Sequence, residues 1–428
     1  MSEQEIADLG PAFAAYLNSF RPCFPQRRTA AHFDTFCRGL LSDLPRKSVE
    51  PIALESGTAV RTLQEFLATT QWDHAGARDL LQQRLRTVLA EVPADDLGTV
   101  GVIDETSCQK WGDQTPGVQR QYLGCVGKID NGIVTVHVGV AKGTFQALLD
   151  VDLYLPKAWA EDRQRCREAG IPDDVGYRSK WRIALDQLIR LSDNGVTFDW
   201  LTFDEWYGSK VPFLWLLSLV GQKFVAEVPV NFTVRRSAND RAWRADEVQP
   251  ARTTADWQRF RIARQTVADQ VWRAKSMRVW AAEGWQQLVT AVNEATGEVK
   301  YFVTNAIAEP LERVLRVAFR RATIEQTFRL AKQEAGLTHY EGRQYVGLVR
   351  HLLLATIVLG FVAEQTQRLR GEKSGGDRGA GVPGAQPSLW TGAESSSPSP
   401  SATTPERSDS VPPTPQHPGR QVPQETAA

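Results

Sequence analysis

Two short apolar segments that each end in an aspartate constrain the fold of this chain more than any other feature. Residues 100–103 precede Asp104, and residues 200–203 precede Asp204. Short runs of β-branched and aromatic residues predict buried strands. A third acid, Glu325, lies far along the chain in a segment with helical periodicity. Carboxylates on two buried strands and one distant helix can together hold a pair of divalent cations against a phosphodiester.

The segments around the first aspartate predict an antiparallel meander. Its three expected strands are 99–103, 118–129 and 132–140. Asp130-Asn131-Gly132 is a hairpin turn signal between the last two. A crossover helix over 181–191 then leads to a strand over 198–203, which should pair in parallel with the first. Asp104 and Asp204 would therefore lie at neighbouring strand ends, at the edge where open α/β sheets bind ligands.

The first 95 residues have helical spacing. Two short helices, 48–54 and 58–67, are expected on either side of Gly57, which suits a helix end. Such a pair can place its second helix in a DNA major groove, here presenting Arg61, Gln64 and Glu65. An ordinary helical hairpin fits the same spacing, so the pattern leaves both interpretations open.

Residues 222–307 alternate like strands and predict a β-rich insertion. Within it, residues 235–280 contain eleven Lys or Arg and five Asp or Glu residues. The aromatic residues interleaved with them are Trp243, Trp257, Phe260, Trp272 and Trp280. Basic residues can neutralise phosphates while aromatic faces stack on bases. The tryptophans also fit the core of a small sheet, and spacing does not separate the two roles.

A long helix is expected over 311–334, with Arg321, Glu325 and Lys332 on one face. A metal-binding carboxylate would then lie between two cations able to hold phosphates, although the spacing of Arg321 and Glu325 alone favours a routine surface ion pair. The apolar run 352–363 is shorter than the roughly 20 residues that span a bilayer, which favours a buried core helix.

Composition bounds the class of protein. Fifty basic residues balance fifty acidic ones, so any affinity for nucleic acid must come from local basic patches. The five cysteines lack the spacing of a metal site, and no signal peptide is evident. Both observations favour a protein of the reducing cytoplasm. Neither indicates a membrane partner. Residues 371–428 are rich in Gly, Ser and Pro and predict a disordered tail.

The ordered motifs resemble the RNase H-like core of DDE transposases, and among these the bacterial insertion-sequence transposases of the 701 group. The motifs that carry the resemblance are Ile103-Asp104-Glu105-Thr106, Gly117-Val118-Gln119-Arg120-Gln121-Tyr122, Gly127-Lys128-Ile129-Asp130-Asn131, Leu153-Tyr154-Leu155-Pro156 with Trp159, Asp204-Glu205-Trp206-Tyr207-Gly208, Ile324-Glu325-Gln326 through Lys332, Gly336-Leu337, His339-Tyr340 and Arg343. They span about residues 30 to 365. Each motif is weak alone, and the ordered set is specific.

The resemblance implies that Asp104, Asp204 and Glu325 are the catalytic, metal-binding acids. It also implies contacts to DNA phosphates, from Arg321, Lys332, Arg120, Lys128 and Arg343. The expected cofactor is a pair of Mg²⁺ ions, for which Mn²⁺ would substitute. The adjacent acids Glu105 and Glu205 should point away from the metals, because successive strand residues face opposite sides.

Two positions depart from the pattern that the resemblance implies. Ala318 stands where the larger class has a tyrosine on the glutamate helix, which puts a tyrosine contact to the DNA end in doubt. The lysine-rich step after the first aspartate is reduced to Gln109-Lys110-Trp111-Gly112, so one phosphate contact is expected to be missing.

The expected fold class is therefore α/β, an RNase H-like mixed-sheet core with added segments. Its divisions are a helical, possibly helix-turn-helix region (1–95), the first part of the core (96–221), a β-rich insertion (222–307), the second part of the core with the glutamate helix (308–370), and a disordered tail (371–428).

The expected function is metal-dependent cleavage of insertion-sequence ends, followed by transfer of the freed 3′-hydroxyl into target DNA. Expected partners are the terminal inverted repeats, target DNA and a second copy of the chain, in a bacterial cytoplasm and on the nucleoid when bound. The alternatives are an RNase H-like nuclease without strand transfer and a catalytically silent DNA-binding protein. A glycosidase with paired carboxylates would need no metal and is disfavoured by the basic insertion.

Overall fold

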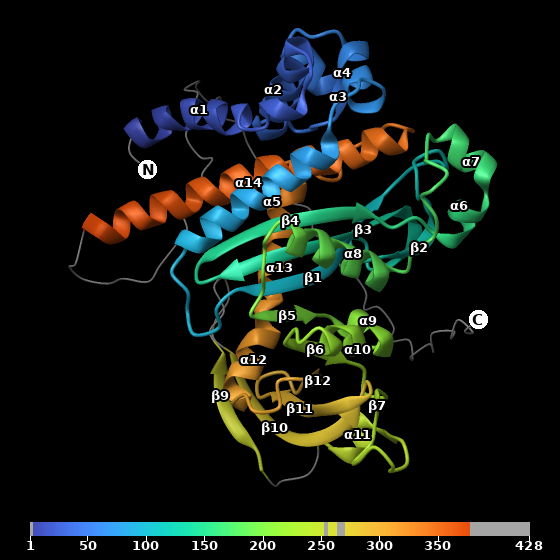
Figure 1. Cartoon of the computed structure of the whole chain (residues 1–428), viewed down its shortest axis with the longest axis vertical. Coiled ribbons are helices and arrows are strands. Elements are labelled where there is room, and N and C mark those ends of the chain that lie inside the picture. Colours follow the sequence, from blue (N-terminus) through green and yellow to red (C-terminus); the bar gives the residue numbers. More distant parts are fainter. Residues whose placement is uncertain (1–2, 252–255, 263–269, 377–428) are drawn as a thin grey trace, which may run out of the picture. The chain divides into compact units, whose positions relative to one another are not determined.

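The computed structural model describes residues 3–251, 256–262 and 270–376 (Figure 1). The expected disordered tail is corrected at its start, because the last helix continues through Gly376. The remainder of that expected tail, residues 377–428, lies outside the described residues.

A mixed sheet of ten strands runs through the described chain. Its strands are β1 (Val100–Gln109), β2 (Gln119–Leu123), β3 (Lys128–Lys142), β4 (Phe145–Leu153), β5 (Trp200–Phe203), β6 (Phe224–Val228), β9 (Gln258–Ile262), β10 (Gln270–Ala281), β11 (Gly284–Asn293) and β12 (Val299–Thr304). The order across the sheet is β2-β3-β1-β5-β6-β12-β11-β10-β9, and β4 pairs with β3. The short strands β7 (Thr233–Val234) and β8 (Trp243–Arg244) form a separate pair.

The predicted mixed α/β fold is confirmed, and so is the parallel strand that carries the second aspartate. β1 pairs antiparallel with β3 and parallel with β5, while β5 pairs in parallel with β6. The crossover between β1 and β5 includes α8 (Lys180–Asp193), as the helical spacing of 181–191 predicts. An antiparallel group of strands joined to parallel ones by a crossover is consistent with an RNase H-like core.

The predicted turn at Asp130-Asn131-Gly132 is wrong. β3 runs straight through these residues, and the reversal occurs at 124–127, where Gly127 has a φ of 66°. Gly132 serves a different purpose, since a Cβ there would lie 2.4 Å from the backbone oxygen of Cys108 on β1. The glycine therefore permits close strand approach rather than a bend.

The strands of the expected insertion extend the same sheet. β12 pairs antiparallel with β6, and β11, β10 and β9 follow in turn. Trp272 of β10 is fully buried, as the core interpretation of the tryptophans predicts. Trp243 and Trp257 are half-buried, and each lies under two basic side chains.

The N-terminal region is helical, as predicted. Its helices are α1 (Glu3–Asn18), the 3-10 turn η1 (Arg21–Cys23), α2 (Arg27–Leu41), α3 (Val49–Glu55), α4 (Val60–Ala68) and α5 (His74–Glu91). α3 and α4 pack together across Gly57, and α4 begins after Ala59 rather than Thr58. Arg61, Gln64 and Glu65 are exposed on α4, while Leu63 and Phe66 are buried. DNA binding by this pair stays a prediction.

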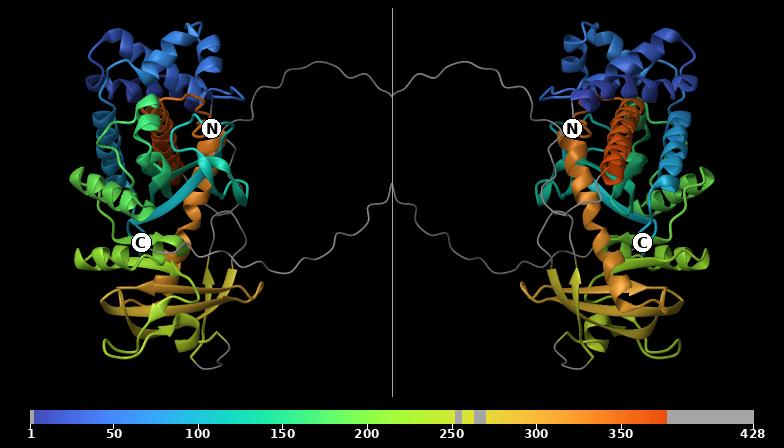
Figure 2. Two further views of the ribbon diagram at one scale, coloured as in Figure 1. Left: turned by 90° about the vertical axis from the view of Figure 1, so that its right-hand side faces the viewer. Right: turned by 90° about the vertical axis from the view of Figure 1, so that its left-hand side faces the viewer.

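The remaining helices lie along the rest of the chain. They are α6 (Lys157–Glu161), α7 (Arg163–Glu168), α9 (Glu205–Gly208), α10 (Val211–Leu219), α11 (Ala245–Val248), α12 (Leu311–Arg320), α13 (Ala322–Gln333) and α14 (Tyr345–Gly376). The expected single helix over 311–334 is thus two helices that meet at Arg321, whose dihedral angles are still helical. Figure 2 shows the α12–α13 segment and α14 as separate helices.

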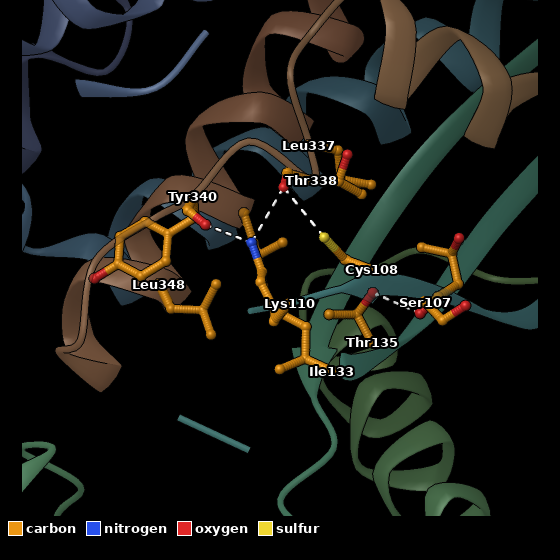
Figure 3. Close-up of a pocket in the computed structure, with 11 residues that line it drawn as sticks. Ser107, Cys108, Lys110, Ile133, Thr135, Leu337, Thr338, Tyr340 and Leu348 are labelled. Atoms are coloured by element: carbon orange, nitrogen blue, oxygen red, sulfur yellow. Dashed lines mark hydrogen bonds between the residues drawn. The ribbon is translucent and has the colours of Figure 1, made fainter. Parts of the chain in front are cut away.

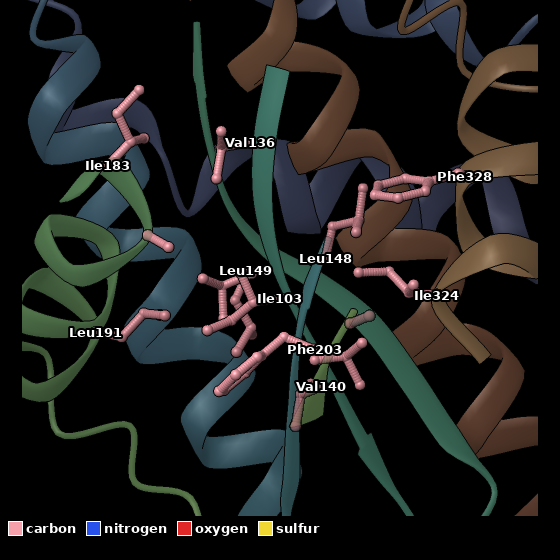
Figure 4. Close-up of a cluster of buried hydrophobic side chains, with 14 of the residues drawn as sticks. Ile103, Val136, Val140, Leu148, Leu149, Ile183, Leu191, Phe203, Ile324 and Phe328 are labelled. Atoms are coloured by element: carbon pink, nitrogen blue, oxygen red, sulfur yellow. The ribbon is translucent and has the colours of Figure 1, made fainter. Parts of the chain in front are cut away.

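Helices cover both faces of the core strands. Figure 4 shows Ile183 and Leu191 of α8 on one side of the sheet, and Ile324 and Phe328 of α13 on the other. Among the described residues, α14 alone is long and apolar enough to cross a membrane, but 78% of its apolar window is buried inside the protein. It packs against α2, α4, α5 and β4, which confirms the prediction of a core helix.

Candidate active site

β1 and β5 bring the first two acids to one place. Ile103 pairs with Phe203 across the two parallel strands, so the next residue on each strand, Asp104 or Asp204, lies where β5 leaves the sheet. Asp204 ends β5 as predicted and caps α9, because its carboxylate accepts a hydrogen bond from the backbone N–H of Tyr207 at 3.2 Å. Asp104 does not end its strand, since β1 continues to Gln109 along β3.

The third acid, Glu325, is connected to Asp104 through contacts that both make with Arg321. Glu325 lies on α13 with 66% of its side chain exposed. Arg321, one turn earlier, places its Nη1 3.2 Å from Oδ2 of Asp104 and 3.9 Å from Oε1 of Glu325. The structure therefore gathers Asp104, Asp204 and Arg321, with Glu325 at the exposed side of the arginine.

Glu227 is an acid at this place that the sequence did not single out. It lies on β6, beside β5, and its Oε2 is 3.5 Å from Nη2 of Arg321. Lys300 of β12 holds its other oxygen at 2.5 Å. The available signal was one carboxylate inside the otherwise apolar run 224–228, but only the strand order shows that this run lies next to β5.

Acidic groups outnumber basic ones around these residues. We call the following set the acid cluster: Asp104, Glu105, Asp204, Glu205, Glu227 and Glu325. Four cations, Lys180, Lys210, Lys300 and Arg321, interact with it. Six carboxylates against four cations leave an excess of two negative charges when every group is ionised.

Burial and mutual repulsion act on the protonation of the acid cluster. Burial raises the pKa of Asp104 to about 7, with the Asp204 charge reinforcing the shift and Arg321 opposing it. Burial also raises the pKa of Asp204, for which Arg321 again opposes and Glu227 reinforces the shift. Carboxylates in this condition are stabilised by any cation that reaches them.

The donor chemistry of the acid cluster fits a hard divalent cation. Carboxylate oxygens are the ligands that Mg²⁺ and Mn²⁺ prefer, and the excess of negative charge favours the binding of cations. Within residues 3–251, 256–262 and 270–376, no three His, Cys, Asp or Glu side chains converge closely enough to hold an ion. The Arg321 guanidinium lies among the carboxylates of Asp104, Glu227 and Glu325.

Glu105 points away from Asp104, as strand alternation predicts. It forms an ion pair with Lys180 at the start of α8, at 2.8 Å, whereas Asp104 contacts Arg321. Burial raises the pKa of Glu105, and Lys180 opposes that shift.

The structure spreads the other predicted phosphate-binding residues along the chain. Lys332 is half-buried in the last turn of α13, and Arg120 is exposed on β2. Lys128 pairs with Asp130 at 3.3 Å, while Arg343 is exposed before α14. In the described part of the chain, none of these four forms an ion pair with an acid of the cluster.

Lys110 has a structural role instead of standing free for DNA. Figure 3 shows its ammonium turned toward the segment that follows α13, where it donates to the backbone oxygens of Thr338, at 3.3 Å, and Tyr340. Cys108 donates to the same Thr338 oxygen at 3.2 Å. These contacts fasten the end of β1 to that segment, beside a small pocket.

Two comparisons with known proteins find similarities to this chain. A family model described as "DDE superfamily endonuclease" matches residues 19–291, which include Asp104, Asp204 and Glu227 but end before Glu325. The chain is also similar to the "Probable transposase for insertion sequence element IS701" of Microchaete diplosiphon, with 34% identity over 230 residues. That match covers 52% of this chain and 53% of the relative, so the chain spans about half the length of the relative it matches.

Proposed function

The chain belongs to the DDE superfamily of endonucleases, and from that premise we propose that it is the transposase of a bacterial insertion sequence. The observation that carries the proposal is the junction of β1 and β5, where Asp104 and Asp204 meet beside Arg321. The similarity to the IS701 protein supports transposition over other reactions of the superfamily.

In the proposed site, Asp104, Asp204 and Glu325 would hold two Mg²⁺ ions, or Mn²⁺ in their place. Such ions activate a water and stabilise the leaving oxygen of an in-line phosphoryl transfer. Asp104 and Asp204 are fixed by β1 and by the cap of α9, so they provide the rigid part of the site. Glu325 is exposed on α13 and provides the part that joins last.

Arg321 has two roles in this proposal. Without DNA its guanidinium offsets repulsion among Asp104, Glu227 and Glu325. When DNA enters, the planar fork of the guanidinium can turn to the non-bridging oxygens of the scissile phosphate. The same movement frees the carboxylates of Asp104 and Glu325.

The proposed reaction sequence ends in strand transfer. Hydrolysis frees a 3′-hydroxyl at the end of the element, and this hydroxyl then attacks a target phosphodiester in the same site. The proposed partners are terminal inverted repeats, target DNA and a second copy of the chain, since two ends must be held together. We place the protein in the bacterial cytoplasm, on the nucleoid when it is bound to DNA. Lys332, Arg120, Lys128 and Arg343 are proposed to contact phosphates outside the cleavage point.

The test is a cleavage and joining assay on DNA that carries the ends of the element, with Mg²⁺, with Mn²⁺ and with EDTA. We expect Glu325→Gln and Asp104→Asn to lose cleavage, by at least a hundredfold, and to keep DNA binding. The matched control is Glu312→Gln, which removes an exposed acid of α12 and should cleave like the unmodified protein.

Each outcome of this assay supports a different function for the chain. A metal-dependent joined product, absent in Asp104→Asn, supports the transposase. Cleavage without joining supports a nuclease of the same fold, and binding without cleavage supports a silent DNA-binding protein. A Glu325→Gln variant that still cuts would remove Glu325 from the metal site.

A further inference from the structure

Two lysines lie over one tryptophan beside the acid cluster. The ammonium of Lys210 is 4.5 Å from the centre of the Trp206 ring, and that of Lys180 is 5.2 Å from it. The ring of Tyr154 lies 5.4 Å from Lys180, and Tyr207 packs edge-on against Trp206 at 5.0 Å. Aromatic faces attract cations, so this arrangement holds two like charges close together.

Both lysines also stand at the start of a helix. Lys180 is the first residue of α8, which has 14 residues, and Lys210 is the N-cap of α10, which has nine. Neither helix has an acidic residue in its first turn or a side chain that caps it. Cations at the positive end of a helix dipole lower stability, whereas anions there raise it. An anion bound between these two helix starts would therefore interact favourably with both helix dipoles.

Lys210 is available to such an anion. Lys180 is held by Glu105 at 2.8 Å, but no ion pair involves Lys210 among the described residues. Burial lowers the pKa of Lys210, and the positive charge of nearby Lys180 lowers it further. Asp204 acts in the opposite sense, so this lysine lies within electrostatic reach of the proposed catalytic acid.

We propose that Lys210 and Lys180, held over Trp206 at the starts of α10 and α8, bind a backbone phosphate of DNA next to the phosphate that is cut. This inference rests on the proposed function. The ligand is a phosphodiester anion, because the site offers two ammonium groups to oxygen and reads no base. Lys210 contributes a charge without an ion-pair partner among the described residues, and Lys180 contacts the same phosphate while its ion pair with Glu105 holds it in place.

The test measures DNA affinity against salt in EDTA, so that it does not depend on cleavage. Each phosphate neutralised by a lysine contributes about 0.9 to the slope of log affinity against log salt. We expect Lys210→Gln to lower that slope by about one contact. Its deficit relative to the unmodified protein should shrink about three- to fourfold between 50 and 200 mM salt. Lys210→Arg, which keeps the charge, should restore the slope.

A neutral methylphosphonate placed at single positions of the DNA identifies the phosphate concerned. At one position near the cleavage point it should weaken binding by the unmodified protein and leave binding by Lys210→Gln unchanged. The matched control is Lys157→Gln, an exposed lysine of α6, which should respond to the methylphosphonate like the unmodified protein. Thermal unfolding checks the fold, and the melting temperature of Lys210→Gln should change little, because relief at the helix start offsets loss of the contact with Trp206.

Two results would overturn the subsite. One is an unchanged salt slope in Lys210→Gln together with additive effects of every methylphosphonate. The other is that Lys210→Gln and the unmodified protein bind DNA alike but differ in their affinity for inorganic phosphate at constant ionic strength. That result would assign the site to free phosphate. If the unmodified protein binds DNA and does not cut, the proposed function fails and the affinity test still decides the subsite. Absence of any DNA binding refutes both.

Discussion

The ion pair that fastens α8 to the sheet gives a prediction whose magnitude follows from burial. Arg190 of α8 contacts Oδ2 of Asp150 at 3.0 Å and Oδ2 of Asp152 at 2.7 Å. Asp150 is 2% exposed and also accepts a hydrogen bond from Gln82 of α5 at 3.1 Å. Replacing Arg190 by Met keeps the volume but leaves a buried carboxylate without its cation. Because α8 begins at Lys180, the loss should also disturb the phosphate subsite.

Protonation of Asp150 limits the cost of Arg190→Met. Its ordinary pKa is 3.8 and its folded-state pKa is about 6, so ionised Asp150 already costs the unmodified protein about 3 kcal/mol at pH 7. Without Arg190 the carboxyl becomes neutral, which costs about 4 kcal/mol at pH 7 and about 2 kcal/mol at pH 5. At pH 5 the unmodified protein also carries about 2 kcal/mol, so protonation adds about 1 kcal/mol to the loss at pH 7 and almost nothing at pH 5. The broken contact with Asp152 adds about 1.5 to 3 kcal/mol at both pH values. We therefore expect Arg190→Met to lose about 3 kcal/mol of unfolding free energy at pH 7 and about 1 kcal/mol less at pH 5.

The sign of the pH dependence follows from the direction of the pKa shift. Burial raises the pKa of Asp150 to about 6, and Arg190 is the main group that opposes the rise. A carboxyl whose folded-state pKa is raised contributes stability below its unfolded pKa, and this is lost as pH rises through the folded-state value. Removing Arg190 raises that value further, so the variant should be weakest in mild alkali.

Urea unfolding followed by tryptophan fluorescence measures the loss. The matched control is Arg182→Met on the same helix, whose side chain is 56% exposed and lies 3.7 Å from Asp186, and it should cost less than about 1 kcal/mol. The double variant Arg190→Met with Asp150→Asn should recover most of the stability, because no buried charge remains. Equal losses in the two single variants, or a larger loss at pH 5 than at pH 7, would refute this reasoning.

Two further predictions concern close packing and a buried histidine. A Cβ on Gly208 would lie 1.9 Å from the backbone oxygen of Glu227. Gly208→Ala should therefore push α9 away from β6, lower the unfolding free energy by about 1 to 3 kcal/mol and reduce cleavage. The control is Gly124→Ala, whose Cβ would meet no atom within 4 Å and which should change neither stability nor cleavage. Burial lowers the pKa of His351 to about 4, so the unfolded state takes up more protons and stability should fall as pH drops below about 6.5. His351→Gln should flatten that fall in urea midpoints between pH 7.5 and 5, whereas parallel curves would exclude this histidine as the cause.

The sequence was most informative where one local signal had one structural meaning. The apolar run before Asp204 predicted a strand that ends there, and β5 does end at Phe203. Helical spacing likewise predicted α8 and the buried α14. Asp130-Asn131-Gly132 misled, because glycine serves close strand approach at Gly132 as readily as it serves a turn. A turn signal alone does not separate these uses.

The composition of the site depended on contacts between distant segments. The i, i+4 spacing of Arg321 and Glu325 was visible in the sequence, but the contacts of Arg321 with Asp104 and Glu227 arise from tertiary packing. Glu227 joins the site because β6 pairs with β5, which no local pattern specifies. No sequence pattern singled out Lys210, and its position beside Lys180 over Trp206 arises from tertiary packing.

The pairing of β12 with β6 joins the strands of the expected insertion to the core strands in one sheet, and this fixes the distance between them. Five strand-to-strand steps separate β1 from β10, and at about 4.8 Å each they set a distance of about 24 Å. One base pair occupies about 3.4 Å of duplex, so the span corresponds to about seven base pairs. A domain tethered by a flexible linker would sample many such spacings, whereas hydrogen-bonded strands fix one. A duplex that lay across these strands and contacted the basic strands of the insertion would therefore meet the proposed cleavage site at a fixed distance, which is set by the strand spacing and not by the length of a loop.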